Sequence, residues 1–171
     1  MRRGVVLWSC LLATLLAASG VCSLAAATYS LLGRSAPDFA LRAVGGPNVR
    51  LSEHRGDVVV VTFWSSRCAP CSTQLAALER SLRTFGAAGL KVFGVNVDDD
   101  QERARQFAAG QSVRFPLLLD PGKEVSRRYR VDNLPMTVLI DRNGSVRHVH
   151  RDYSGKADQL YLGELRTLLN E

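Results

Sequence analysis

Hydrophobic and polar positions follow two periods along the chain, and these predict alternating strands and helices. The run 58–63 is entirely apolar or β-branched, as expected for a strand covered by helices on both faces. After it, leucines recur at spacings of three and four and predict a helix over about 71–85. The same reasoning predicts further strands at 91–97, 115–119, 135–140 and 146–150, and further helices at 101–109, 123–129 and 158–169.

The order of these elements predicts an α/β fold. A hairpin of 39–41 with 49–51, turning at Gly45–Asn48, precedes the first central strand. Strands and helices then alternate, which indicates parallel strands joined by helices. The turn Asp141–Gly144 joins the last two strands as an antiparallel hairpin. The prediction is a central mixed β-sheet flanked by helices, with an additional N-terminal hairpin.

The beginning of the chain differs from the rest. Arg2 and Arg3 precede the uncharged stretch 4–33, whose first half is typical of a signal peptide, and small residues at 25–27 offer a cleavage site. If it is not cut, the apolar stretch 4–27 has 24 residues, and a bilayer span needs about 20. We therefore expect 1–27 to be a signal peptide or an N-terminal membrane anchor, 28–34 a linker, and 35–171 one domain outside the cytoplasmic membrane.

Length and charge narrow the range of functions. The chain has 171 residues, 46% of them hydrophobic, which is enough for one domain with a core. Its net charge is +6, and loss of the two leader arginines leaves 20 basic and 16 acidic residues, a net charge of +4. The densest basic group, Arg127, Arg128 and Arg130, lies in a short predicted helix and is expected to be a solvated face. We expect no nucleic-acid partner, and membrane contact only through 4–27.

Two cysteines carry the candidate chemistry. Of four in the chain, Cys10 and Cys22 lie in the leader, so the domain keeps Cys68 and Cys71. Lipid attachment at Cys22 is a third possible use of the leader, disfavoured by the bulky Val21 before it. The domain pair stands where a strand gives way to a helix, whose N-terminal N–H groups and dipole favour thiolate.

The spacing of the pair selects redox chemistry over metal binding. A separation of three places both sulfurs on one face, close enough to form a disulfide. One sulfur can then attack a partner's disulfide and the other can resolve the mixed intermediate. A structural zinc site needs a second pair of ligands, which the domain lacks. We expect a redox-active Cys68–Cys71 disulfide, with no metal and no other cofactor.

Three motifs, in the same order, resemble the TlpA/ResA branch of the thioredoxin-like thiol–disulfide oxidoreductases, in the AhpC/TSA–redoxin superfamily. They are Phe63–Cys71, Phe115–Pro121 and Leu134–Gly144. The resemblance runs from Ser35 to the C-terminus and implies a thioredoxin fold. It implies Cys68 as the exposed nucleophile, Cys71 as the buried resolving thiol, and a cis peptide bond between Leu134 and Pro135. Such a bond beside the disulfide is expected to leave the Leu134 backbone groups free to pair with a substrate strand.

Three residues depart from the family pattern. Arg67 stands where many thioredoxins have Trp, and its guanidinium is expected to favour a Cys68 thiolate and acidic partners. Thr62 replaces the buried Asp of thioredoxins, and Gln74 replaces a Glu frequent in the TlpA/ResA branch. Neither acidic group is present to accept the proton of Cys71, so we expect slower resolution and altered thiol pKa values.

These observations predict an extracytoplasmic thiol–disulfide oxidoreductase, in the periplasm or on the outer face of the cytoplasmic membrane. We expect it to reduce disulfides in exported proteins and to receive electrons from a membrane thiol donor. The resemblance favours a role in cytochrome c maturation or copper-site assembly.

Two other functions stay open at this point. The same two cysteines could bind Cu(I) in a metallochaperone, and His148 and His150, on one face of a strand, could add ligands. A thiol peroxidase is less favoured. Val60 and Trp64 stand where peroxiredoxins have the Pro and Thr that precede their reactive cysteine.

Overall fold

The computed structural model describes residues 31–153 and 157–171, so the predicted leader, 1–27, lies outside the described residues. Within this part of the chain, the secondary structure matches the predicted order. The strands are β1 Ala40–Ala43, β2 Asn48–Arg50, β3 Val58–Trp64, β4 Leu90–Asn96, β5 Leu117–Leu119, β6 Met136–Ile140 and β7 Val146–His150. The α-helices are α1 Ala69–Phe85, α2 Gln101–Ala109, α3 Glu124–Arg128 and α4 Ala157–Leu169, and Leu51–His54 and Gly86–Ala88 form 3₁₀ turns.

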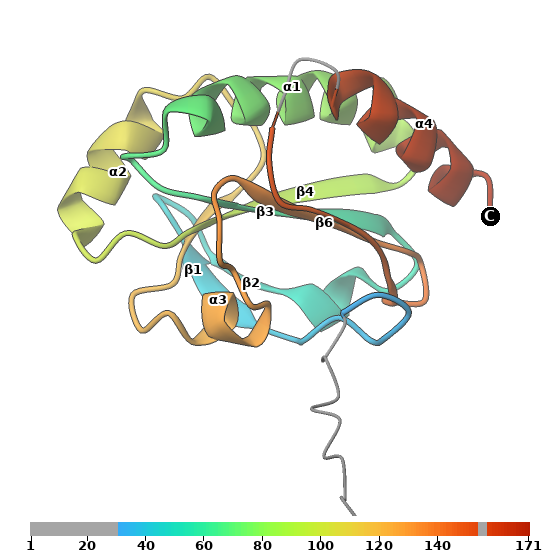
Figure 1. Ribbon diagram of the computed structural model, residues 1–171, viewed down its shortest axis with the longest axis horizontal. Helices are drawn as coiled ribbons and strands as arrows, with labels where there is room; N and C mark the ends of the chain where they lie inside the picture. Colours follow the sequence, from blue (N-terminus) through green and yellow to red (C-terminus); the bar gives the residue numbers. More distant parts are fainter. Residues whose placement is uncertain (1–30, 154–156) are drawn as a thin grey trace, which may run out of the picture.

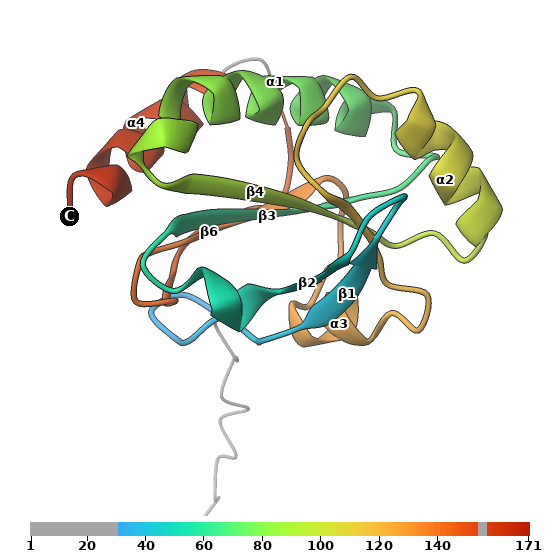
Figure 2. The ribbon, with the colours of Figure 1, turned by 180° about the vertical axis from the view of Figure 1, so that it is seen from behind.

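A seven-stranded mixed sheet runs through the centre of the domain in the order β2-β1-β5-β4-β3-β6-β7. Strands β3, β4 and β5 are parallel, as predicted, while β6 runs antiparallel to β3 and forms a hairpin with β7. The N-terminal hairpin of β1 and β2 joins the sheet beside β5. Helices α1, α2 and α4 cover one face and α3 the other (Figures 1 and 2). The predicted α/β thioredoxin-like fold is confirmed.

Burial on both faces of β3 produces two apolar cores. All seven of its residues are buried, and the alternation of a strand sends them to opposite sides of the sheet. Val59, Val61 and Phe63 pack in the core that α3 covers. Val58 and Val60 pack in the core beneath α1 and α4. The central strand is therefore fixed from both sides. Its end gives the loop that follows a fixed starting point.

Trp64, the last residue of β3, is held tightly before that loop begins. It is fully buried and stacks on Phe107 of α2, with ring centroids 5.2 Å apart. Beside it, a Cβ at Gly94 would lie 3.2 Å from the indole Nε1 and 2.6 Å from Leu117 Cδ2. A side chain at this position of β4 would have to move the Leu117 methyl group and would press on the indole, so glycine suits the packing of Trp64.

The element boundaries differ from the predictions where proline or a buried apolar residue intervenes. Helix α1 begins at Ala69 rather than 71, because Pro70 is accommodated in a first helical turn, where its missing N–H costs no hydrogen bond. Strand β5 begins at Leu117 rather than 115, after Pro116, which has no N–H for the ladder. Within the predicted linker, Leu31 is buried and the Gly33 N–H donates to the Val146 carbonyl at 2.8 Å.

Among residues 31–153 and 157–171, no helix is both long enough and apolar enough to cross a bilayer.

Candidate redox active site

Cys68 and Cys71 form a disulfide at the start of α1, with their Cα atoms 5.3 Å apart. Cys68 is the N-cap residue of the helix and is half-buried, whereas Cys71 is completely buried. The sulfur of Cys68 therefore lies at the protein surface, where a partner can reach it, and that of Cys71 lies beneath it in the core with α1 and α4. This arrangement suits attack by the first sulfur and resolution by the second.

The loop before the disulfide is held by Asp98, which follows the neighbouring strand β4. Its Oδ2 accepts hydrogen bonds from the Ser66 N–H at 2.7 Å and from Asn96 Nδ2 at 2.8 Å, and the side chain is almost fully buried. Asp98 begins a run of three aspartates, 98–100, before α2, and helix capping accounts for the last of them. Asp100 accepts from two N–H groups at the start of α2. The role of Asp98 was missed.

We expect Asp98→Ala to lower the rate of disulfide exchange about tenfold while the domain remains folded, because one charge-assisted hydrogen bond to the loop is worth about 1.5–3 kcal/mol. Asp98→Asn is the matched control. Its amide oxygen can still accept from Ser66, so we expect a smaller loss. Insulin reduction and thermal unfolding of both variants measure the two effects. Equal activity of Asp98→Ala and the wild type would show that Asp98 does not position the loop.

Thr62 and Gln74 meet under α1, together with Thr137 of β6. The Thr62 hydroxyl donates to Gln74 Oε1 at 3.1 Å and lies 3.2 Å from Thr137 Oγ1, and Gln74 Nε2 donates to that same Thr137 oxygen. All three residues are buried, so the three groups form a closed, uncharged ring with its hydrogen bonds satisfied internally. No carboxylate lies in this ring to take a proton from Cys71.

Tyr161 of α4 borders the ring and is neutral as well. Burial raises the pKa of its hydroxyl, against the lowering effect of hydrogen bonds with Thr137 and Gln74. The hydroxyl also donates to the Asp152 carbonyl at 3.3 Å. Thr137 and Tyr161 were not among the predicted site residues. The register of β6 on β3, which sets Thr137 opposite Thr62, brings Thr137 there, and the packing of α4 brings Tyr161.

The Leu134–Pro135 peptide bond is cis, as the resemblance implied. Leu134 and Asn133 line an open hollow of about 610 Å³ that also contains Cys68 and Arg67. One expectation is wrong: the backbone of Leu134 is not entirely free. Its N–H donates to the Asn133 side-chain oxygen at 2.9 Å, because the amide of the preceding residue folds back over it.

Arg67 supplies the uncompensated charge of this hollow. Its side chain is exposed, and within the described ranges its guanidinium makes no hydrogen bond or ion pair. The other charged residues that line the hollow are paired: Lys123 lies 2.6 Å from Asp99, and Asp132 lies 2.6 Å from Arg151, which follows β7. A partner that approaches Cys68 therefore meets one free positive charge.

His148 and His150 lie on one face of β7, as predicted, but they bind Glu164 of α4 instead of lying free. His148 Nδ1 is 3.1 Å from one carboxylate oxygen and His150 Nε2 is 2.7 Å from the other. In the part of the chain that the structure describes, no group of three or more His, Cys, Asp or Glu side chains is arranged to hold a metal ion.

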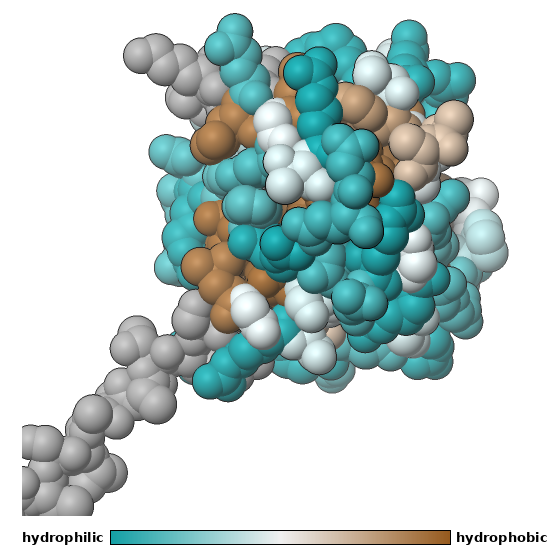
Figure 3. All heavy atoms as spheres, turned by 90° about the vertical axis from the view of Figure 1, so that its right-hand side faces the viewer, coloured by the Kyte–Doolittle hydropathy of each residue, from teal (hydrophilic) through white to brown (hydrophobic). Residues whose placement is uncertain are grey.

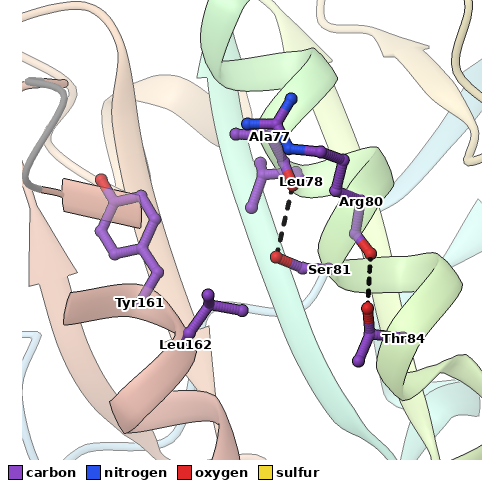
Figure 4. Close-up of a pocket in the computed structure, with 7 residues that line it drawn as sticks. All are labelled: Ala77, Leu78, Arg80, Ser81, Thr84, Tyr161 and Leu162. Atoms are coloured by element: carbon purple, nitrogen blue, oxygen red, sulfur yellow. Dashed lines mark hydrogen bonds between the residues drawn. The ribbon is translucent and has the colours of Figure 1, made fainter. Parts of the chain in front are cut away.

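A second hollow, of about 220 Å³, lies between α1 and α4 (Figure 4). Its hydroxyls are already used, because Ser81 donates to the Ala77 carbonyl at 3.3 Å and Thr84 to the Arg80 carbonyl at 3.0 Å. It lies further along α1 from the disulfide.

The side of the molecule that carries the C-terminus is mostly hydrophilic, with apolar areas between (Figure 3). These features leave the hollow at Cys68 as the candidate active site.

Comparison with known proteins identifies the family. Residues 32–149 match the AhpC/TSA family. The chain belongs to this family. Within it, the thiol-disulfide oxidoreductase ResA of Geobacillus kaustophilus is 33% identical over 122 residues, which are 71% of this chain and 70% of that protein.

Two solved structures agree with this assignment to the AhpC/TSA family. A protein named as a thiol:disulfide interchange protein DsbE, from Chlorobium tepidum, has a TM-score of 0.77 and 32% identity, over 81% of this chain and 97% of that one. The exposed lipoprotein thioredoxin Etrx1 of Streptococcus pneumoniae has a TM-score of 0.66 and 25% identity, over 75% and 98%. This family member is a thioredoxin-like thiol–disulfide oxidoreductase of the ResA/DsbE type, with Cys68 and Cys71 as its CxxC pair.

Proposed function

We propose that this oxidoreductase reduces disulfides in exported proteins, with Cys68 as the attacking and Cys71 as the resolving thiol. The observation that carries the proposal is the pairing of a sulfur at the surface of an open hollow with a sulfur in the core. The Cys68 thiolate attacks a substrate disulfide, forms a mixed disulfide and releases one substrate thiol. Cys71 then attacks the Cys68 sulfur and the second substrate thiol leaves. The substrate disulfide has gained two electrons, and the Cys68–Cys71 pair has lost them and is now a disulfide.

Arg67 and the start of α1 are proposed to keep Cys68 ionised. Both place positive charge beside the sulfur, and a neighbouring arginine lowers a thiol pKa. The absence of a counter-charge on Arg67 also favours substrates with acidic residues next to their cysteine. Leu134 would pair with the substrate main chain through its carbonyl. Its N–H would also pair once its hydrogen bond to the Asn133 side chain is broken.

We expect Arg67→Ala to raise the pKa of the Cys68 thiol and to slow its alkylation by iodoacetamide severalfold at pH 6 to 7. Arg103→Ala is the matched control, since Arg103 is also an exposed arginine near the loop but is paired with Asp100 at 3.8 Å. It should leave the alkylation profile unchanged. If both variants titrate like the wild type, Arg67 plays no part in holding the thiolate.

The proposed location is outside the cytoplasmic membrane, with residues 1–27 as an export signal or an anchor. The long uncharged stretch after Arg2 and Arg3 supports it, as does the name of the pneumococcal relative, an exposed lipoprotein. A membrane thiol protein would return the pair to its reduced form. Substrates in cytochrome c maturation or copper-site assembly fit a reductant in this compartment.

Trapping in the native cell tests this proposal. Cells are quenched with acid and their thiols alkylated, and a reductant is expected to be found mostly with Cys68 and Cys71 reduced. A Cys71→Ser variant should then accumulate exported proteins as mixed disulfides, and a variant that also lacks Cys68 should capture none. A pair found mostly oxidised, with no partner held by Cys71→Ser, would overturn the proposed direction.

A further inference from the structure

Three arginines at the end of α3 surround a hollow on the face of the sheet opposite α1. Arg127, Arg128 and Arg130 line this hollow, of about 380 Å³, together with Ser35 and Pro37 of the first described segment. All three arginines are exposed. They give this surface, the arginine face, a local excess of positive charge that the proposed redox chemistry does not use.

An exposed apolar side chain lies close in sequence to the segment that borders the arginine face. Leu32 and Leu160 are the large hydrophobic residues of the described ranges that remain exposed, each at 53%. Leu32 lies three residues before Ser35, and the exposed Arg34 stands between them. A leucine beside arginines is the composition of surfaces that rest at the boundary between lipid headgroups and acyl chains.

The parts of the arginine face are fixed to one another. Arg128 Nη1 donates to the Asp38 carbonyl at 2.6 Å, and the Tyr129 hydroxyl donates to the Pro37 carbonyl at 2.9 Å. These bonds tie α3 to the segment where the described chain begins, and both lie on the same side of the sheet (Figures 1 and 2).

Three carboxylates lie close to this surface, and one of them, Asp132, is paired with Arg151 at 2.6 Å. That of Asp38 accepts hydrogen bonds from the Ser52 N–H and hydroxyl, with Arg50 3.6 Å away, and Glu124 is exposed at the other end of α3. None of these carboxylates lines the hollow, whereas three arginines do.

The sequence sets how far this face can lie from a membrane. Four residue steps separate Ala27, the end of the apolar stretch, from Leu31. Even fully extended, four residues span only about 14 Å. Charges attract across about 8 Å at physiological ionic strength, and a tether this short allows a domain anchored through 4–27 to bring its arginine face to the lipid headgroups.

We propose that the arginine face rests on anionic lipid headgroups of the membrane that holds the chain, an inference that rests on the anchored form of the proposed function. Ser126 and Val131, the neighbours of these arginines, line the hollow at Cys68. Docking through the arginine face therefore sets the thiol pair beside the membrane, within reach of a donor embedded in it.

Phenylglyoxal, which modifies accessible guanidinium groups, tests this placement. The full chain is incorporated into nanodiscs of phosphatidylcholine, alone or mixed with phosphatidylglycerol, and modification at each arginine is followed by peptide mass spectrometry. Attraction of one arginine to an anionic surface corresponds to about a fivefold change in equilibrium, so we expect modification of Arg127 to slow about fivefold or more on the anionic discs. Arg166, exposed on α4 across the sheet, should react equally on both. High salt should remove the difference.

Charge reversal provides the second measurement. Arg127→Glu should weaken the protection of Arg128 and Arg130 on anionic discs, Arg166→Glu should not, and both should reduce insulin at the wild-type rate. Equal modification of Arg127 on the two lipids overturns the inference. A chain that enters neither kind of disc also overturns it, because the tether is lost, while insulin reduction would still support the oxidoreductase. Loss of insulin reduction with protection intact would overturn the proposed function alone.

Discussion

Cys68→Ser is expected to abolish the insulin reduction that the wild-type chain catalyses with dithiothreitol. A serine hydroxyl does not ionise near neutral pH, and the fully buried Cys71 cannot take its place at the surface. We expect the rate to fall by about three orders of magnitude, to the uncatalysed background. The turbidity of precipitating insulin chains measures it.

Cys71→Ser is the matched variant, because it removes the other half of the pair and leaves the surface sulfur. Once it has been reduced and dithiothreitol has been removed, it should attack insulin a single time and stop as a mixed disulfide that mass spectrometry detects. The two variants thus separate attack from resolution. Continued turnover by Cys68→Ser would show that Cys68 is not the attacking thiol. Single attack by Cys68→Ser and none by Cys71→Ser would reverse the two roles assigned here.

The second large effect concerns stability and Glu79, a buried carboxylate on α1. Its oxygens accept from the Arg114 N–H at 2.8 Å, from Arg114 Nε at 2.9 Å and from Arg83 Nε at 3.1 Å. Burial opposes its ionisation, but these hydrogen bonds outweigh burial and lower the pKa of Glu79 below its ordinary value of 4.5. Because both arginine side chains are largely exposed, the bond to the Arg114 backbone carries most of the effect.

We expect Glu79→Gln to lower the free energy of unfolding by about 2 kcal/mol at pH 7. The lowered pKa sets the pH dependence: the stabilisation is fully present above pH 4.5 and disappears as the pH falls through the lower pKa of the folded state. Denaturant unfolding of wild type and variant should therefore differ at pH 7 and converge in acid.

Glu102→Gln is the control for this measurement. Glu102 lies on the surface of α2, 3.8 Å from Arg105, and its loss should change the unfolding free energy by less than about 0.5 kcal/mol. A difference between wild type and Glu79→Gln that stayed constant down to pH 3 would show that packing, and not charge, accounts for the effect.

The elements of the fold could be predicted because their signals are local. The apolar run of β3 and the leucine spacing of α1 each express one period within a few residues, and three motifs in order indicated the family. The cis bond at Pro135 came from the resemblance alone, since a proline before a strand is equally compatible with a trans bond.

The hydrogen bonds that hold the site in place could not be predicted, because they join residues far apart in sequence. Thr137 meets Thr62 only once β6 lies antiparallel beside β3 in one particular register, 75 residues away. Asp98 reaches Ser66 only because the ends of two parallel strands meet at one edge of the sheet. Along the chain, Asp98 and the helix cap Asp100 stand in one run of aspartates, and nothing local distinguishes their roles.

The Asn133 side chain already binds the Leu134 backbone, where a substrate strand is proposed to pair. Its oxygen holds the Leu134 N–H, and its Nδ2 is anchored on the Arg151 carbonyl at 2.9 Å. A peptide that pairs with the Leu134 N–H has to displace the Asn133 oxygen. One hydrogen bond to an amide oxygen then replaces another, so the peptide gains little affinity from it. Weak binding suits a thiol–disulfide oxidoreductase, which has to release its partner once the exchange of sulfurs is complete.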